Sequence, residues 1–221
     1  MKQIIVALFA CLPLMGMAQN TWEVPQEKTE EVKPKQQKKA LFETKKKEDA
    51  KYLAGAVPEV DGRVVFTLDK KVPGMSADEI YKKVYDVIHA MTQEENQFPQ
   101  SKIAVINKSE HTIAARMREW LVFQNTFLSL DRTIFNYTLI AKAADGRLVL
   151  TMERLSYQYE KDRTDVRGGF DTKAEDWITD KEALNKKQTK LLKYSGKFRR
   201  KTIDRKDNIF DRVCRALSVK Y

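Results

Sequence analysis

Apolar and polar residues alternate along residues 63–71, the period-two pattern of a half-buried β-strand. Pro73 and Gly74 then end the strand and supply the chemistry of a turn. One face of this strand carries Val64, Phe66 and Leu68. The pattern predicts that ordered structure begins at Gly62 with a strand that ends in a tight turn.

The pattern changes to a helical period after the turn. Ser76 and Glu79 have the spacing of a capping box, in which each side chain binds the backbone N–H of the other residue. An amphipathic helix is therefore predicted to start there. Its apolar stripe consists of Ile80, Tyr81, Val84, Tyr85, Ile88 and Met91.

Four further strands are predicted, at residues 102–107, 112–123, 132–143 and 147–159. Asp145-Gly146 between the last two is a strong signal for a two-residue hairpin turn. In the last strand the apolar phase slips by one residue after Met152. A β-bulge near Glu153-Arg154 would absorb this slip, because each later side chain would otherwise change face.

The C-terminal part returns to helical spacing. A weak stripe covers residues 173–193 and a stronger one covers 197–219, with a break at Ser195-Gly196. An antiparallel sheet with one apolar face needs cover, and the helical segments are the available cover. The chain is therefore predicted to be an α+β protein. Its expected order is strand, helix, four antiparallel strands and basic C-terminal helices, with residues 160–221 packing on or extending the domain at 62–159.

The first 61 residues differ in composition from the rest. Residues 1–18 have a positive start, an apolar run and small residues at Gly16 and Ala18, as in a signal peptide cleaved after Ala18. Lipidation at Cys11 is a less favoured alternative, since the chain stays apolar after it. Residues 19–61 are expected to be a charged and largely disordered linker. We expect an exported protein with no transmembrane segment in its mature form.

The segment Gly62-Arg-Val-Val-Phe-Thr, the turn Val72-Pro-Gly-Met-Ser and the start Glu79-Ile-Tyr resemble a family of secreted bacterial proteins. That family is classed as domain of unknown function 4468, with a TBP-like fold. The resemblance covers residues 62–159 and extends less strongly to the C-terminal segment. It implies a curved antiparallel sheet with helices packed on one face, in the order β-α-β(4)-α. It implies no established activity, and no catalytic residue is carried over.

The net charge of +10 comes from the C-terminal segment. Residues 181–221 hold 14 Lys and Arg against 4 Asp and Glu, whereas residues 1–180 hold 27 of each. A basic surface of this kind suits an anionic envelope component or an acidic protein. The predicted interaction surface contains Arg199, Arg200, Lys201 and Arg205. Its plainer interpretation is the solvated outer face of a helix that covers the sheet.

A second candidate surface lies on the sheet. Arg116, Arg118 and Trp120 share the polar phase of one strand, and with Tyr157 and Tyr159 they would form an aromatic, basic face. An ordinary solvated sheet face is the alternative. Glu119 interrupts the apolar phase of the same strand. A buried carboxylate needs a partner, and Arg118 or Arg132 is the expected one, unless the site is functional.

The sequence offers little for catalysis. His89 and His111 are isolated, no His or Cys cluster has metal-ligand spacing, and no glycine-rich phosphate loop follows a strand. No metal, cofactor or catalytic residue is therefore expected. Cys214 falls beside the apolar positions of the last helix, which indicates a buried thiol; an intermolecular disulfide is the alternative.

Three functions remain open at this stage. The favoured one is a non-enzymatic binding module, secreted or associated with the envelope, with a basic surface for an anionic partner. The second is binding of nucleic acid or another polyanion through the sheet face, although export argues against genomic DNA as the partner. The third is a hydrolase or transferase whose site is assembled from scattered residues, and a pocket lined by Glu119 would support it.

Overall fold

The computed structural model describes residues 50–127, 129–161 and 169–221. The expected signal peptide, the alternative lipidation site at Cys11 and residues 19–49 of the expected linker lie outside this part of the chain. No helix in the described ranges is both long enough and apolar enough to cross a membrane.

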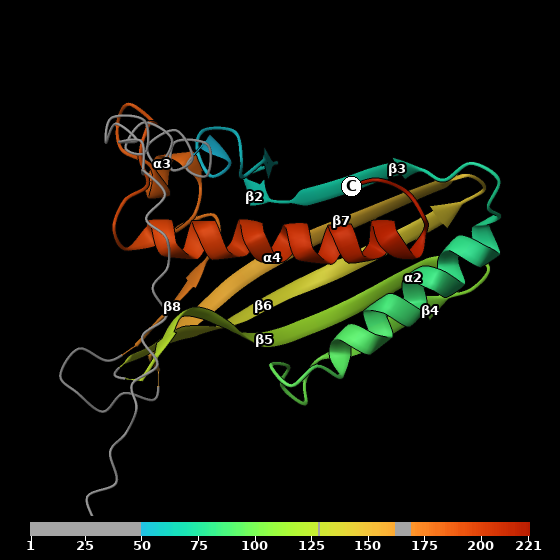
Figure 1. Cartoon of the computed structure of the whole chain (residues 1–221), viewed down its shortest axis with the longest axis horizontal. Helices are drawn as coiled ribbons and strands as arrows, with labels where there is room; N and C mark the ends of the chain where they lie inside the picture. The colour runs from blue at the N-terminus through green and yellow to red at the C-terminus, as the bar shows by residue number, and fades with distance from the viewer. Residues whose placement is uncertain (1–49, 128, 162–168) are drawn as a thin grey trace, which may run out of the picture. The chain divides into compact units, whose positions relative to one another are not determined.

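A six-stranded antiparallel sheet forms the centre of the fold (Figure 1). The strand order is β3-β7-β6-β5-β4, and β8 pairs with the part of β7 that β3 does not reach. A separate two-stranded hairpin, β1 (Glu59–Val60) with β2 (Arg63–Val64), precedes it. The strands of the main sheet are β3 (Phe66–Lys71), β4 (Lys102–Asn107), β5 (Thr112–Thr126), β6 (Ser129–Ala144), β7 (Arg147–Tyr159) and β8 (Phe170–Lys173).

The predicted bulge in β7 is confirmed. Arg154 has a positive φ of 56°, and the β6–β7 register shifts between Asn136 and Thr138. The extra residue restores the inward phase, so Leu155 and Tyr157 are buried on the same side as Met152. Tyr157 therefore lies in the core and Tyr159 packs against Phe198 on the same side, so the predicted place of both on the polar sheet face was wrong.

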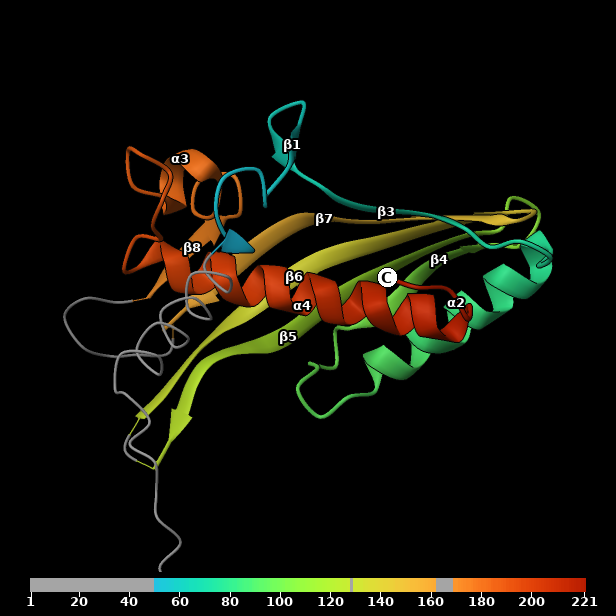
Figure 2. The same ribbon diagram turned by 45° about the horizontal axis from the view of Figure 1, so that its top comes forward.

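Helices α2 (Ala77–Thr92) and α4 (Ser195–Ala216) cover one face of the twisted sheet (Figures 1 and 2). The predicted capping box of α2 is present, with Ser76 Oγ accepting from the Glu79 backbone N–H. The apolar stripe of α4 enters the core through Phe198, Ile203 and Val213, among others. The predicted α+β architecture with helices on one face is confirmed.

The helix predicted at residues 173–193 does not form. Only α3 (Asp180–Ala183) is helical there, and it is a single turn. Phe170–Lys173 instead extends the sheet as β8, because the edge of β7 beyond the bulge offers unpaired backbone groups. Two residues of the weak apolar stripe, Ala183 and Leu184, are buried at the end of α3 and directly after it.

The ordered domain begins earlier than the sequence predicted. Tyr52 and Val57 are only 8% and 4% exposed and belong to the hydrophobic core, so residues 50–61 are not part of a linker. The Tyr52 hydroxyl donates to Asp204 of α4 at 2.7 Å. The sequence did not predict that this segment is ordered, because two apolar residues in a charged segment give no periodic signal.

Candidate functional site

The face of the sheet opposite the two helices carries the charged and aromatic residues of β5. Met117, Glu119 and Leu121 are buried beneath the helices, so Arg116, Arg118 and Trp120 lie on the other face. We call this second surface the open face, because neither α2 nor α4 covers it. The sequence correctly placed Arg116, Arg118 and Trp120 together on a polar face of β5.

The register of the sheet adds residues that the sequence analysis did not select. Lys102 of β4 pairs with Arg116, and both side chains are exposed. Arg132 of β6 lies near Trp120 of β5, because Trp120 pairs with Ile134 and Val122 pairs with Arg132. The period of two along β6 would have identified Arg132, because Phe135 and Tyr137 face the core and Arg132 falls on the opposite face.

Two guanidinium groups of the open face stack on aromatic rings. Arg132 Cζ lies 3.7 Å from the Trp120 ring centroid, and Arg118 Cζ lies 5.2 Å from that of Phe98. Phe98 and Trp120 contact each other, with centroids 5.0 Å apart. Stacking fixes the plane of a guanidinium and leaves its in-plane N–H groups available to a ligand.

Four basic residues of this surface have no acidic partner among the described residues. Within the described ranges, Lys102, Arg116, Arg118 and Arg132 make no ion pair with a carboxylate, although Arg118 Nη1 donates to Asn136 Oδ1 at 3.1 Å. The four residues form a band of positive charge along β4, β5 and β6. We refer to them as the basic band.

A row of polar side chains leads from the basic band across the sheet. The register aligns Arg118, Asn136, Ser156 and Lys173 on β5, β6, β7 and β8, and Asn136 Nδ2 donates to Ser156 Oγ at 3.4 Å. Shallow hollows flank this row. One of about 280 Å³ is lined by Trp120, Leu130, Arg132, Ile134, Gln158, Glu160 and Lys161. Another of about 500 Å³ is lined by Gly62, Arg63, Arg154, Leu155, Ser156, Lys173, Glu175 and Asp176.

The C-terminal residues predicted as one surface are divided by the fold. Arg199 is completely buried: Nε donates to the Tyr52 carbonyl at 2.6 Å, Nη1 to that of Ile178 at 2.7 Å, and Nη2 binds Asp180 at 2.7 Å. Burial lowers the pKa of Arg199, and Asp180 opposes this shift. Arg199 therefore holds separate segments together inside the protein, and its predicted role in an exposed surface is wrong.

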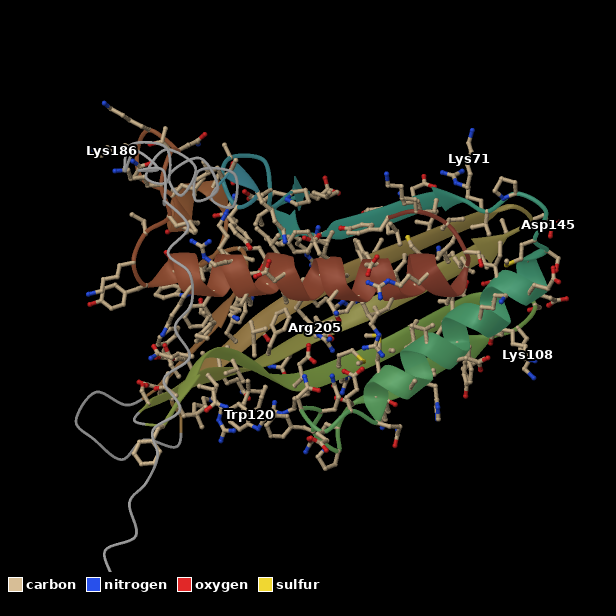
Figure 3. The ribbon with its side chains drawn as sticks, viewed as in Figure 1. Lys71, Lys108, Trp120, Asp145, Lys186 and Arg205 are labelled. Atoms are coloured by element: carbon tan, nitrogen blue, oxygen red, sulfur yellow. The ribbon has the colours of Figure 1, made fainter. Side chains whose placement is uncertain are left out.

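Arg205 also lies inside the fold, between α4 and the sheet (Figure 3). Its Nε and Nη2 bind the two oxygens of Glu119 at 2.8 and 2.7 Å. Arg200 and Lys201 remain partly exposed, and Arg200 Cζ lies 4.6 Å from the Tyr52 ring centroid. Because α4 turns Arg199 and Arg205 inward, the four predicted residues do not form a continuous basic patch.

Glu119 is paired, but not with the expected arginines. Besides Arg205, it accepts hydrogen bonds from Tyr137 Oη at 2.9 Å, Asn96 Nδ2 at 2.9 Å and Gln97 Nε2 at 2.6 Å. Arg118 and Arg132 cannot reach it, because both lie on the open face. Burial, together with the nearby Glu119 carboxylate, raises the pKa of Tyr137 well above its usual value. The Glu119 carboxylate is thus fully buried, and both of its oxygens accept hydrogen bonds from protein groups.

The two histidines and Cys214 make ordinary contacts within the fold. His111 Nε2 lies 2.9 Å from Asp78 Oδ1 in an exposed turn, and His89 stacks on Tyr85. Cys214 is free and buried, as its place on the helix predicted. In the part of the chain that the structure describes, no group of three His, Cys, Asp or Glu side chains is placed to hold a metal.

Comparisons with known proteins define the class of this fold. The model of a domain of unknown function with a TBP-like fold, DUF4468, matches residues 66–158. The crystal structure of a TBP-like protein from Parabacteroides distasonis, 23% identical, superposes with a TM-score of 0.60 over 73% of this chain and 97% of its own. The protein is thus an α+β protein of TBP-like fold.

A second crystal structure identifies the family. A DUF4468 family protein from Bacteroides ovatus is 39% identical, with a TM-score of 0.70 over 77% of this chain and 95% of its own. The chain belongs to the DUF4468 family, as the sequence motifs indicated. Among curated proteins, none matches the chain.

Proposed function

We propose that the protein is a non-enzymatic binding module that holds an anionic partner on the open face of its sheet. The observation that carries the proposal is the basic band. It contains four cationic side chains without carboxylate partners in the described ranges, and two of them are held by aromatic rings. This replaces the C-terminal helix as the proposed surface, because Arg199 and Arg205 are used internally.

The geometry favours an extended partner over a small one. The cations are distributed along three strands, and the hollow beside Arg132 and Trp120 is open to solvent, so among the described residues the charges lie along a surface. An oriented guanidinium binds carboxylate, sulfate or phosphate through two parallel hydrogen bonds. A linear polymer with acidic groups at regular intervals, such as an acidic polysaccharide, would engage several of these side chains together.

Nucleic acid is a weaker candidate for the same surface. Binding of single strands depends on aromatic rings that are free to stack with bases. Arg132 already lies against the Trp120 ring and Phe98 contacts it at a tilt, so this ring offers less surface for a base to stack on. The enzymatic alternative also loses its main support, since Glu119 is enclosed and fully hydrogen-bonded.

The proposal is tested by binding to polygalacturonate, heparin and oligodeoxythymidylate, measured by calorimetry at several salt concentrations. Replacing Arg116, Arg118 and Arg132 together by Gln should weaken polysaccharide binding by roughly a hundred-fold or more, since each charge-assisted contact contributes about 1.5–3 kcal/mol. Arg132→Lys alone should also weaken binding, because an ammonium has no planar edge.

A matched control removes the same charge elsewhere. Lys82, Lys83 and Lys108 are exposed and lie on α2 and in a turn, and their replacement by Gln should leave binding nearly unchanged. Equal losses in the two triple variants would show that only net charge matters and would refute a specific surface. Preference for the oligonucleotide would favour the alternative partner.

We further propose that this binding takes place outside the cytoplasm. The support is the sequence of residues 1–18, with its apolar run and the small residues before Gln19. Protein recovered from the cell envelope or the medium should begin at Gln19. An N-terminus at a lipid-modified Cys11 would replace cleavage after Ala18, and an intact Met1 would refute export through a cleaved signal.

A further inference from the structure

A second exposed basic feature lies between α3 and α4. Residues 185–194, which we call the lysine loop, contain Lys186, Lys187, Lys190 and Lys193 but no acidic residue. All four lysines are exposed, and none makes an ion pair within the described ranges. This loop accounts for much of the C-terminal excess charge that the sequence assigned to a helix.

The lysine loop is held in one shape by its own hydrogen bonds. Asn185 Oδ1 accepts from the backbone N–H of Thr189 at 2.8 Å and of Lys190 at 3.1 Å. Leu184 and Leu191 form a β-bridge, and the Leu192 N–H donates to the Ala183 carbonyl at 2.9 Å. The loop therefore presents its lysines without a large cost in backbone ordering when a partner arrives.

Apolar side chains are exposed in the same loop. Leu192 is 42% exposed and Tyr194 is 72% exposed. The turn between β5 and β6 adds Phe127, whose side chain is fully exposed, and the start of β6 adds Leu130, which is 53% exposed. Large apolar side chains displayed beside unpaired cations are typical of surfaces that meet a membrane.

The loop and the β5–β6 turn lie at the same end of the domain (Figures 1 and 2). The first turn of α4, which follows the loop, is joined to the start of β6, which follows the turn: Lys197 Nζ lies 2.7 Å from Asp131 Oδ2. Lys186 projects from this end, whereas Lys71 and Lys108 lie at the opposite end (Figure 3). We call the exposed apolar and cationic side chains at this end of the domain the terminal surface.

We propose that this terminal surface docks the protein on an anionic lipid bilayer. The four lysines match the negative headgroups, and Tyr194, Leu192 and Phe127 suit the boundary between headgroups and acyl chains, where amphipathic and apolar side chains are stabilised. A bilayer explains both properties, since a soluble polyanion would use the lysines but would gain nothing from the exposed apolar groups. This contact is peripheral, and it is separate from the basic band.

The test is co-sedimentation of the chain from Gln19 with phosphatidylcholine vesicles that contain or lack phosphatidylglycerol. Binding should require the anionic lipid and should weaken with salt. Replacing Lys186, Lys187, Lys190 and Lys193 by Gln should lower the partition coefficient by about a hundred-fold or more. The matched control, Lys71, Lys82, Lys83 and Lys108 to Gln, changes net charge equally at exposed positions outside the loop and should have little effect.

Two further variants separate the possible outcomes. Leu192→Ser with Tyr194→Ser should reduce vesicle binding at least ten-fold while leaving the fold intact, because both side chains are exposed. The Arg116, Arg118 and Arg132 triple variant should still bind vesicles, which separates this proposal from the sheet-face function. Equal loss in the lysine control, equal binding to neutral vesicles, or no effect of the apolar substitutions would overturn docking on lipid.

Discussion

Arg199 and Arg205 lie on one helix six residues apart, and each satisfies a different buried site. Arg199 binds backbone carbonyls of the N-terminal segment and of the irregular segment before α3. Arg205 binds a carboxylate in the sheet. A buried charge is costly unless it is paired and hydrogen-bonded, so each contact restricts how α4 lies on the sheet.

The pair formed by Glu119 and Arg205 gives a prediction at this scale. Arg205→Met should lower the free energy of unfolding by about 3–5 kcal/mol, because it leaves the buried Glu119 carboxylate without its counter-charge. Glu119→Leu should cost less, since Arg205 keeps Glu94 at 3.3 Å. The double variant should cost much less than the sum, since no lone charge remains. Urea-induced unfolding of the four proteins measures this coupling.

A control on the same helix is Lys201→Met, which should change stability by only about 0.5 kcal/mol. Fully additive effects in the double variant would show that the two side chains do not act as a pair. If only one of the two single substitutions lowered the stability, the hydrogen bonds of Glu119 with Tyr137, Asn96 and Gln97 would account for the effect instead.

At the scale of elements, the bulge in β7 decides which residues face the helices. Without the extra residue at Arg154, Leu155 and Tyr157 would turn to the open face, and Ser156 would be buried. Tyr157 Oη lies 2.7 Å from Thr202 Oγ1 of α4, so the bulge also anchors the covering helix. The polar row on the open face depends on the same change of phase.

Arg154 has a positive φ, and this conformation predicts a graded effect of substitution. Arg154→Val should destabilise the protein by about 1–2 kcal/mol, because a β-branched side chain is disfavoured in left-handed backbone. Arg154→Gly should be nearly neutral, since relief of strain offsets the greater freedom of the unfolded chain. Thermal unfolding compares the two variants.

Thr151→Val provides the control for this comparison, since Thr151 lies in the regular part of β7 on the open face and pairs with both neighbouring strands. A β-branched residue should be tolerated there. If Arg154→Val were as stable as Arg154→Gly, the bulge would not constrain this position.

At the scale of the whole molecule, residues 50–57 belong to the domain because they form hydrogen bonds with α4 and α3. Tyr52 and Leu53 supply carbonyl oxygens to Arg199, and the Gly55 N–H donates to Asp180 at 2.7 Å. These contacts join positions more than a hundred residues apart. The N-terminal segment therefore completes the site in which Arg199 is buried.

A truncation tests this dependence. A chain that begins at Gly62 should be about 3–5 kcal/mol less stable than one that begins at Gln19, because Arg199 loses two carbonyl partners and the core loses Tyr52 and Val57. Arg199→Met should cost less in the shorter chain than in the longer one. Equal stability of the two chains, measured in urea, would assign residues 50–61 to a linker after all.

The sequence by itself determined the elements whose signals are local. The alternation of β5 and β6, the Asp145-Gly146 turn, the capping box at Ser76 and the slip in β7 each predict structure from neighbouring residues, and all are present. The placement of Arg116, Arg118 and Trp120 on one face followed from the same period of two. Family membership also followed from short motifs.

Only the tertiary structure decided which charges are exposed. Periodicity gives the face of a helix or strand, but not the distant groups that meet it, and pairing determines whether a charge can be buried. Arg199, Arg205 and Glu119 therefore became internal, while Arg132 and Lys102 joined the surface through the register of the sheet. The exposed lysine loop likewise arose where β8 and a single turn of helix replaced the expected long helix.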